Sequence, residues 1–392
     1  MPSPAKLIYR TGFLAQKMRR PPVGIVGVGA AGFRPALRGV STRELMYQAA
    51  SLAYLDAGVD PRKEVDSFVT TSEDLWEGWS ITDEMVPDQL GGAGRPVCTI
   101  PGDAVTGLGN AAMMIEAGAA QVVAVEAHSK ASDVLDKEAV ERMAQEPTLV
   151  RPLGMGRAAL AGLEMSAFFG ASGFGLDDCD AVIASARKRG SLNPLASFAG
   201  RGGREGGVAS SPLRRVDIAG YADAAVVVVL ASAEWARKKG RQAVWLEAAT
   251  WSSSLPWFDG GGAALAGYAR ASFERAARKA ELRDGLGSVD LVEADDSYSF
   301  KLLQHVLSIS RDWKEAEGVL DGRGPALNPS GGSLAVGNLL EASAMHRVYE
   351  AVIQLRGEAG RRQIERARRA LVQSWRGIPT ATGGVALLSV SP

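Results

Sequence analysis

The sequence predicts an α/β protein built on a parallel sheet with helices on its faces. Short runs rich in β-branched residues alternate with helix-forming segments along most of the chain, an order typical of parallel strands joined by crossover helices. The 46 glycines and the 6% aromatic content suit many tight strand-to-helix turns. At 392 residues the chain is too long for one ordinary core, so we expect two domains or one internally duplicated unit.

The first half is predicted to begin with a strand and a capped helix. Residues 23–28 are a β-branched run that ends in Gly-Ala-Ala-Gly, as expected for a buried strand that enters a turn. Ser41 starts a capping box with Glu44, because its hydroxyl can accept from the backbone N–H of Glu44, and the helix should run to about Ala57. Further elements are predicted as strands at 65–70, 97–100 and 121–126 and a helix at 108–117.

An inserted, largely helical region is expected from about residue 129 to residue 211. The strand signals lapse there, and helix-like stretches at 155–169 and 176–189 precede a Gly/Arg-rich segment at 200–207. A strand at 224–230 then closes the first half.

The second half repeats the strand–helix–strand order, which indicates an internal duplication. Its predicted elements are strands at 243–249, 288–294 and 384–390 and a helix at 264–282. The predicted organisation is an N-terminal arm at 1–20, a first half at 21–240 and a second half at 241–392.

The bulk composition excludes several classes of protein. The 44 basic and 44 acidic residues cancel, which argues against a general surface for nucleic acid or anionic membrane. The longest uninterrupted apolar run, 224–231, is strand-sized and far short of the roughly 20 residues of a membrane span. Cys98 and Cys179 are the only cysteines, so no disulfide framework is expected, and no spacing suggests a metal site. With no secretory signal in residues 1–20, we expect a cytoplasmic protein.

A glycine-rich loop that runs into a long amphipathic helix is the most informative segment. From Asn328 to Gly357 the chain reads NPSGGSLAVGNLLEASAMHRVYEAVIQLRG. It resembles the C-terminal catalytic loop of the thiolases, the acyl-CoA carbon–carbon bond enzymes, whose pattern is Asn-x-x-Gly-Gly, a short spacer, then Gly-His-Pro-x-Gly. The spacing is kept, but Gly337 is followed by Asn338 where the family has its catalytic histidine.

Three further segments extend the resemblance to the sterol-carrier-protein-X branch of the thiolases, in the same order and over almost the whole chain. They are Asn193-Pro-Leu-Ala with Ser211-Pro-Leu, Ala222-Asp-Ala-Ala-Val-Val, and Glu293-Ala-Asp-Asp-Ser-Tyr. The resemblance implies the thiolase fold, two similar βαβαβαββ halves in five layers, α-β-α-β-α, with an inserted loop domain. It also implies a coenzyme A thioester as substrate or ligand, with no covalently bound cofactor.

The nucleophilic cysteine of the thiolases is absent from both possible registers of this chain. Counting forward from the strand at 97–100 places Ala104 at that position, and counting back from the helix end places Pro101 there. We interpret the nearby Cys98 as a buried structural residue. Asp103 is either a replacement base or a cap for the following helix, and we favour the cap.

The other catalytic positions are changed as well. Asn338 has no pKa near neutrality and cannot act as a general base, but its amide could hold a thioester carbonyl in an oxyanion-hole role. Asp295 stands where the branch has histidine, and Ser297 where it has cysteine. Near the C-terminus, Ile378 begins the segment that replaces Cys-x-Gly-Gly-Gly.

Tyr298 keeps an enzymatic interpretation open. The Tyr-Ser pair at 298–299 resembles that of the steroid side-chain aldolases, a branch of the same fold that also lacks the cysteines and uses tyrosines as acid and base on β-hydroxyacyl-CoA. Those aldolases place another tyrosine where this chain has Asn338. The alternative is a tyrosine packed against the sheet with its hydroxyl satisfied.

The resemblance also suggests where coenzyme A would bind. It assigns substrate contacts to Asn328, Ser330, Gly331, Gly332 and Gly337 in the loop, to His128 at the edge of the cleft, and to Arg187 and Arg201 in the inserted region. Arginines suit the phosphates of coenzyme A, although solvated surface charge explains them equally well. For His128 we favour a structural role.

The remaining charged segments are assigned to the surface. His305 and His346 fall within predicted helices and are expected at the surface or the core edge. The arginines between 361 and 369 are expected to form a basic helix that faces solvent or an assembly contact.

Three functions therefore remain open. The first is an acyl-CoA enzyme related to the acetyl-CoA C-acyltransferases but without the cysteine nucleophile. The second is a non-catalytic acyl-CoA-binding or scaffold subunit, and the third is a tyrosine-dependent aldolase. The resemblance further implies a homodimer or a dimer of dimers, and a small partner with an OB fold and a zinc ribbon that helps to hold the acyl-CoA.

Overall fold

The structure is a computed structural model of the chain. It describes residues 21–74, 76, 78, 81–200, 207–254, 265–378 and 380–392. The predicted arm at 1–20 and the predicted ligand Arg201 lie outside these residues.

The central feature is a ten-stranded sheet whose two halves have the same strand order. The strands of the first half are β1 (Val23–Arg34), β2 (Ser67–Thr71), β3 (Val97–Ile100), β4 (Val122–Ser129) and β7 (Asp223–Ser232). Those of the second half are β8 (Val244–Ser253), β9 (Leu291–Glu293), β10 (Ala326–Leu327), β11 (Arg369–Trp375) and β12 (Thr382–Ser389). The order is β3-β2-β4-β7-β1 in the first half and β10-β9-β11-β12-β8 in the second.

Strand directions repeat between the halves too, which confirms the predicted duplication. In the first half β2 is parallel to β3 and β4, whereas β7 is antiparallel to β4 and β1. In the second half β9 is parallel to β10 and β11, whereas β12 is antiparallel to β11 and β8. The sheet is therefore mixed, and the prediction of a parallel sheet is wrong for β1, β7, β8 and β12. The halves join where β1 pairs with β8 at Gly24 and Ile25.

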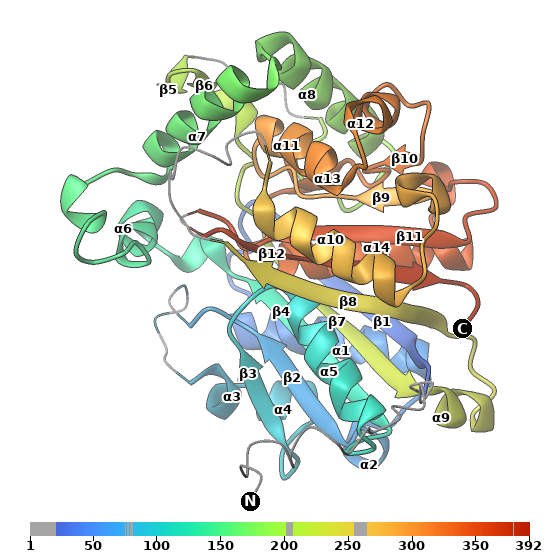
Figure 1. The fold of residues 1–392 in the computed structure, drawn as a ribbon. Helices are drawn as coiled ribbons and strands as arrows, with labels where there is room; N and C mark the ends of the chain where they lie inside the picture. Colours follow the sequence, from blue (N-terminus) through green and yellow to red (C-terminus); the bar gives the residue numbers. More distant parts are fainter. Residues whose placement is uncertain are drawn as a thin grey trace, which may run out of the picture.

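The helices and the two halves of the sheet form five layers, as the resemblance implied. Helices α5 (Ala104–Glu116) and α14 (Ala342–Arg356) lie in the middle and contact strands of both halves (Figure 1). Helix α1 (Thr42–Ala57) covers the outer face of the first half, and α10 (Gly267–Lys279) and α11 (Ser299–Ile309) cover the outer face of the second. Successive residues of a strand point to opposite faces, so in β7 Val226 and Val228 join the shared middle core while Val227 and Val229 pack towards α1.

The inserted region is mostly helical, as predicted. It contains α6 (Lys137–Met143), α7 (Arg157–Ser172), α8 (Leu176–Gly190) and a small hairpin of β5 (Val208–Ser210) and β6 (Leu213–Arg214). The remaining short helices are α2 (Pro61–Glu64), α3 (Thr82–Met85), α4 (Pro87–Leu90), α9 (Ala233–Lys238), α12 (Trp313–Leu320) and α13 (Gly332–Val336).

The predicted capping box at Ser41 is confirmed. Its hydroxyl accepts from the Glu44 backbone N–H at 3.2 Å, and the Glu44 carboxylate accepts from the Ser41 N–H at 2.8 Å. Helix α1 ends at Gly58, whose left-handed φ of 62° is the backbone conformation that favours glycine.

Strand β1 is longer than predicted, because its glycines serve packing rather than a turn. A Cβ atom at Gly27 would lie 2.5 Å from the Ala53 carbonyl oxygen, and one at Gly29 would lie 2.2 Å from that of Ala49. These glycines let α1 lie directly on the strand, which continues to Arg34.

The predicted basic helix at 361–369 is wrong. Helix α14 ends at Gly357, a single 3₁₀ turn covers residues 360–362, and Arg369 begins β11, a strand that was not predicted. Two of the arginines are held by carboxylates rather than solvent: Arg362 pairs with the buried Glu350, and Arg369 with Glu247.

Candidate active site

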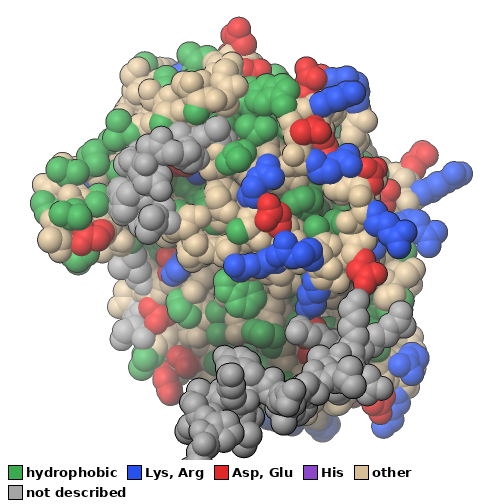
Figure 2. All heavy atoms as spheres, in the orientation of Figure 1, with side chains coloured by type: hydrophobic (Ala, Val, Ile, Leu, Met, Phe, Trp, Pro, Cys, Tyr) green, Lys and Arg blue, Asp and Glu red, His purple; other side chains and the backbone are tan. Residues whose placement is uncertain are grey.

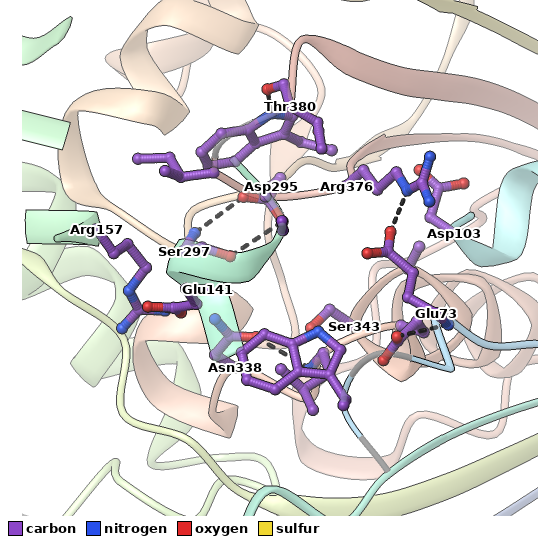
Figure 3. Close-up of a pocket in the computed structure, with 18 of the residues that line it drawn as sticks. Glu73, Asp103, Glu141, Arg157, Asp295, Ser297, Asn338, Ser343, Arg376 and Thr380 are labelled. Carbon is purple, nitrogen blue, oxygen red and sulfur yellow. Dashed lines mark hydrogen bonds and ion pairs between the residues drawn. The ribbon is translucent and has the colours of Figure 1, made fainter. Parts of the chain in front are cut away.

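A cavity of about 70 Å³ lies where loops from both halves meet the inserted region (Figure 3). The turn before α5, the loop between β9 and α11, and the segments after α13 and β11 all reach it, together with α6 and α7. The structure places in its lining all four residues that the sequence analysis proposed for catalysis, Asp103, Ser297, Tyr298 and Asn338.

Tyr298 is buried in this lining with a free hydroxyl. Its side chain is 2% exposed, and its ring lies 5.9 Å from that of Phe300 and 6.1 Å from that of Trp375, centroid to centroid. Within the described part of the chain, its hydroxyl oxygen has no hydrogen-bond partner. Burial raises the pKa of Tyr298 above its ordinary value, although the positive charge of Arg157 opposes the rise. A buried hydroxyl without a hydrogen-bond partner calls for an explanation, and the alternative of a tyrosine whose hydroxyl is satisfied does not fit.

Beside Tyr298 stands a polar cluster of Arg157, Tyr221 and Glu141 that the sequence analysis missed. The guanidinium of Arg157 lies 4.7 Å from the Tyr221 ring centroid and 5.8 Å from that of Tyr298. It donates to the Tyr221 hydroxyl oxygen at 2.5 Å and pairs with Glu141 at 3.1 Å. The Tyr221 hydroxyl in turn donates to Glu141. These residues come from α7, from the segment before β7 and from α6, and they share no local motif.

Asp103 is the cap of α5 and also faces the cavity. Its Oδ1 accepts from the backbone N–H of Val105 at 3.0 Å, and its Oδ2 accepts from the Ser374 hydroxyl at 2.5 Å. The predicted cap is thus confirmed. Burial raises the pKa of Asp103, against the effect of these hydrogen bonds. Of the two residues counted as nucleophile positions, Ala104 is buried in the first turn of α5 and Pro101 is exposed, and neither lines the cavity.

Asn338 is fixed by its backbone. Its N–H donates to the Gly220 carbonyl at 2.7 Å, and its own carbonyl accepts from Ala222 at 3.0 Å. The side-chain oxygen accepts from the backbone N–H of Leu340 at 3.0 Å, which leaves the amide nitrogen as the donor that faces the cavity. This arrangement suits a donor to a carbonyl oxygen.

Ser297 is coupled to buried charged residues, of which Asp295 also lines the cavity. Its backbone N–H donates to Asp295 at 3.0 Å, and Asp295 forms an ion pair of 2.7 Å with Arg347 of α14. Arg347 is 1% exposed and also lies 3.7 Å from Asp296. Burial raises the pKa of Asp296 to about 7, although Arg347 opposes the rise. This network holds the loop between β9 and α11 in place.

The opposite wall of the cavity carries another ion pair. Arg376, just after β11, pairs with Glu73, and the Glu73 backbone N–H donates to the Glu341 carboxylate at 2.8 Å (Figure 3). Sequence reasoning missed these residues as well, since no pattern links segments so far apart in the chain.

The loop residues that were predicted to bind coenzyme A shape the loop through their hydrogen bonds and backbone angles, and Asn328 also lines a second cavity. Asn328 forms two hydrogen bonds with the backbone of Ala294, through its side-chain oxygen at 2.7 Å and its nitrogen at 3.0 Å. Ser330 donates to Glu293 through its N–H and its hydroxyl. Gly331, Gly332 and Gly337 have φ between 63° and 123°, and a Cβ at Gly332 would overlap the Asp296 carboxylate. Ser330 and these glycines do not line the described cavity; the loop's contribution to it is Asn338.

Glu293 provides a test of this buried network. Burial and the charge of Glu350 raise the pKa of Glu293 to about 8, above its unfolded value of about 4.5. The stabilising contribution of its proton is complete below pH 4.5 and is lost as the pH rises through 8. We expect the free energy of unfolding, measured with urea, to fall between pH 5 and pH 8 by roughly 1 kcal/mol or more in excess of the fall in Glu293→Gln. Parallel pH curves for the two proteins would contradict this.

His128 and Cys98 lie away from the cavity. His128 is 2% exposed at the end of β4, where its Nδ1 lies 3.0 Å from the Glu126 carboxylate, so its assignment to substrate binding is not supported by its position. Cys98 is half-buried in β3, and burial raises the pKa of its thiol. Neither residue lines the cavity.

The predicted phosphate ligands are not gathered around the cavity. Arg187 is partly exposed on α8 and does not line it, and Arg201 lies outside the described residues. Arg189, two residues further along α8, lines a second cavity of about 320 Å³ between α8, α11 and α12. Its guanidinium donates to the Leu327 carbonyl.

His305 and His346 are buried, contrary to the surface assignment. His305 lies between the Tyr268 hydroxyl at 2.7 Å and the Asp295 carbonyl at 2.9 Å, and burial with the nearby Lys301 lowers its pKa to about 3. His346 packs against Phe33 in the middle layer. Both belong to helices that are buried on nearly all sides, so periodicity gave no exposed face for them.

No group of three or more metal-binding side chains is found in the described segments. In the same segments no single helix is long and apolar enough to cross a membrane. Only α7 and α8 meet the length and composition test together, as a pair bent by 112°.

Comparisons of sequence place the chain near the thiolases. Residues 262–389 match the family described as Thiolase C-terminal domain-like. An acetyl-CoA acetyltransferase of Methanothermobacter thermautotrophicus is 26% identical over 392 residues, covering 94% of this chain and 98% of the relative. Sterol carrier protein 2 of Rattus norvegicus is 32% identical over 162 residues, covering 38% of this chain and 29% of that protein.

Solved structures share the fold. The Ltp2-ChsH2(DUF35) aldolase superposes with a TM-score of 0.79 at 20% identity, covering 95% of this chain and 99% of that one. A monomeric SCP2-thiolase-like protein type 1 from Mycobacterium smegmatis gives a TM-score of 0.68 at 21% identity, covering 95% and 78% of the two chains. An acetyl-CoA acetyltransferase from Syntrophomonas wolfei gives 0.71 at 15% identity, covering 95% and 100%. The family match over residues 262–389, the duplicated five-layered fold and these relatives together support a place for the chain in the thiolase superfamily, near its sterol-carrier-protein-2-like branch.

Proposed function

We propose that this protein cleaves a β-hydroxyacyl-CoA thioester by a retro-aldol reaction and does not use a cysteine nucleophile. The observation that carries the proposal is Tyr298, which lines the cavity and whose hydroxyl is buried and has no hydrogen-bond partner among the described residues. Such a hydroxyl would serve a proton transfer to substrate, which is the chemistry that carbon–carbon cleavage next to a thioester requires.

The thiols of the chain do not suit acyl transfer. Neither Cys98 nor Cys179 lines the cavity, and burial raises the pKa of the Cys179 thiol to about 12. A thiol attacks as the thiolate, so a raised pKa suppresses the reactive form. This supports a reaction in which the protein exchanges protons with the substrate rather than an acyl group.

The proposed cleavage is balanced without a co-reactant. The β-hydroxyl loses its proton and becomes a carbonyl, the Cα–Cβ bond breaks, and its electron pair passes into the thioester enolate. Tyr298, kept protonated by burial, donates its proton to Cα, which gives a shortened acyl-CoA and an aldehyde or ketone. The Asn338 amide would donate to the enolate oxygen, a role that needs no ionisable group.

A non-catalytic acyl-CoA-binding subunit is the alternative. In it, the same cavity, with the ion pair of Arg376 and Glu73 in one wall, would hold the thioester without reacting with it. Binding without turnover would then be the whole function.

We also propose that the protein works in an assembly. Strand β3 forms one end of the ten-stranded sheet, and its backbone could pair with a second copy in a homodimer. Figure 2 shows hydrophobic side chains at the surface over the region of α6, which carries Glu141, and the exposed residues there include Leu135, Met143, Leu149 and Leu153. Such a surface suits a protein partner beside the cavity, such as the small acyl-CoA-binding protein expected from the resemblance.

The direct test is turnover of short and long β-hydroxyacyl-CoA thioesters, with the shortened acyl-CoA measured by chromatography and the carbonyl product trapped as a hydrazone. We expect both products in equal amounts. Calorimetry that shows binding of the thioester with no products would support the non-catalytic alternative. A stable acyl adduct on Cys98 after incubation with acetyl-CoA, detected by mass spectrometry, would overturn the proposal.

A further inference from the structure

We propose that Tyr221 and Glu141 form the second proton-transfer pair of this site, accepting the proton of the substrate β-hydroxyl, and that Arg157 positions them. This inference rests on the retro-aldol function proposed above. The pair would act on the hydroxyl of the β-carbon, because Tyr298 protonates Cα and cannot accept the β-hydroxyl proton at the same time.

The hydrogen bonds of this cluster run in one direction, from Arg157 through Tyr221 to Glu141. Arg157 has donors only, so it fills one lone pair of the Tyr221 oxygen, and the Tyr221 proton points to Glu141. Tyr221 lines the cavity, so its oxygen would accept a proton from a bound substrate while the phenol proton passes to the carboxylate. Tyr221 thus acts as a relay, and Glu141 as the final acceptor.

The backbone that carries Tyr221 is paired with the backbones of Tyr298 and Asn338. Residues 218–222 run between the loop that carries Tyr298 and the segment that carries Asn338. Ile218 forms an isolated β-bridge with Tyr298, and Tyr221 forms one with Asn338. Tyr221 is therefore held beside the amide that would bind the thioester oxygen, and on the same segment that fixes Tyr298. A β-hydroxyacyl thioester bound by Asn338 would present its Cα and its β-hydroxyl to neighbouring groups of one rigid segment.

The electrostatic setting of Glu141 suits a proton acceptor. It is 6% exposed, and the charged groups that face it are Arg157 from α7 and Lys137 and Glu138 from its own helix. Burial raises the pKa of Glu141, while Arg157 opposes the rise, and the result is a stronger base than an exposed carboxylate. The Arg157 guanidinium, in contact with both tyrosine rings, would also stabilise a tyrosinate on Tyr298 after its proton has gone to Cα.

The protons balance over a full cycle. The β-hydroxyl proton enters the Tyr221–Glu141 pair, and Tyr298 gives an equivalent proton to Cα. Once the products leave, the proton on Glu141 returns to Tyr298 through Tyr221 or water, so no external acid or base is consumed.

The test compares Tyr221→Phe, Glu141→Gln and Tyr298→Phe in the full-length protein, with steady-state rates over pH 5 to 9. The wild-type kcat should fall on the acid side as Glu141 takes up a proton, since only the carboxylate accepts. We expect Tyr221→Phe to lower kcat by about 10²-fold or more with KM within a few-fold. Glu141→Gln should lower kcat similarly and abolish the acid limb, and Glu141→Asp should restore that limb with part of the rate. Glu116→Gln, at the surface pair with Lys279, is the carboxylate control and should behave as wild type.

Each outcome decides the inference. If Tyr298→Phe loses activity while Tyr221→Phe keeps the wild-type kcat, or if the acid limb persists in Glu141→Gln, the relay is wrong and the retro-aldol function stands. If the wild-type protein cleaves no β-hydroxyacyl-CoA, the proposed function fails and the relay falls with it. Melting temperatures near that of wild type for the folded variants would exclude a loss of rate through unfolding.

Discussion

Replacing Tyr298 with phenylalanine is expected to lower kcat for retro-aldol cleavage by roughly 10²- to 10⁴-fold. The change removes one oxygen atom and leaves the ring packed against Phe300 and Trp375. Because that hydroxyl has no hydrogen-bond partner within the described residues, its removal strands no other polar group. We therefore expect the free energy of unfolding to stay the same or to rise slightly while turnover is lost.

Tyr54→Phe is the matched control for this prediction. Tyr54 is also a buried tyrosine, but its hydroxyl donates to the Leu90 carbonyl at 2.7 Å on the outer side of the first half-sheet. The control should lose about 1 kcal/mol of stability and keep its kcat, the reverse of the Tyr298→Phe pattern. The measurements are product formation and urea unfolding on both variants. Wild-type kcat in Tyr298→Phe would remove the tyrosine from the mechanism.

Much of the fold could be predicted from the sequence, because its signals are local or are spread over separate motifs. The capping box at Ser41 depends on four consecutive residues, and it appears where predicted. Glycines were harder to interpret, since one residue type serves two physical purposes. Gly27 and Gly29 admit the backbone of α1, and a one-dimensional pattern cannot distinguish that close approach from a turn.

Strand β11 was missed for a related reason. Its sequence contains Gln373 and Ser374, which are fully buried, and it follows a cluster of arginines. Ser374 is buried at no cost because its hydroxyl donates to Asp103, a residue 271 positions away in the chain. Because this partner is so far away in the chain, the sequence does not show that these polar residues can be buried. The segment therefore lacks the apolar pattern by which a strand is predicted.

The candidate site also contains residues that could be predicted from local motifs and residues that could not. Asp103, Tyr298 and Asn338 could be found because each follows a strand or glycine motif that resembles a catalytic loop. Arg157 and Glu141 could not be predicted, because they come from the inserted region and only the folded structure brings them into contact with each other and with Tyr221. The part of the site that the family pattern encodes was therefore predictable, and the part that the inserted region contributes was not.

Arg347→Met should be the most destabilising single change in this region, with an expected loss of about 3–5 kcal/mol. Arg347 is 1% exposed, and its Nη2 lies 2.7 Å from Asp295 and 2.7 Å from the Ser333 hydroxyl. Methionine fills a similar volume but leaves buried carboxylates without their cation. Urea unfolding measures the loss. Arg323→Met, whose partners Glu317 and Asp321 are exposed, is the control and should change stability by less than about 1 kcal/mol.

The loss of stability in Arg347→Met should depend on pH. Whether the loss grows or shrinks as the pH rises identifies its cause. Burial already raises the pKa of Asp296 to about 7 with Arg347 in place, and removal of the cation should raise it further. At pH 5 the folded variant can hold a proton on Asp296, so the penalty is partly relieved, whereas at pH 8 the penalty is larger because keeping that proton then costs free energy. In the double variant Arg347→Met with Asp296→Asn, the combined loss should be smaller than the sum of the single losses. Additive losses with no dependence on pH would mean that Arg347 contributes packing alone. A coupled, pH-dependent loss would mean that the cation holds the two carboxylates of the loop that carries Ser297 and Tyr298.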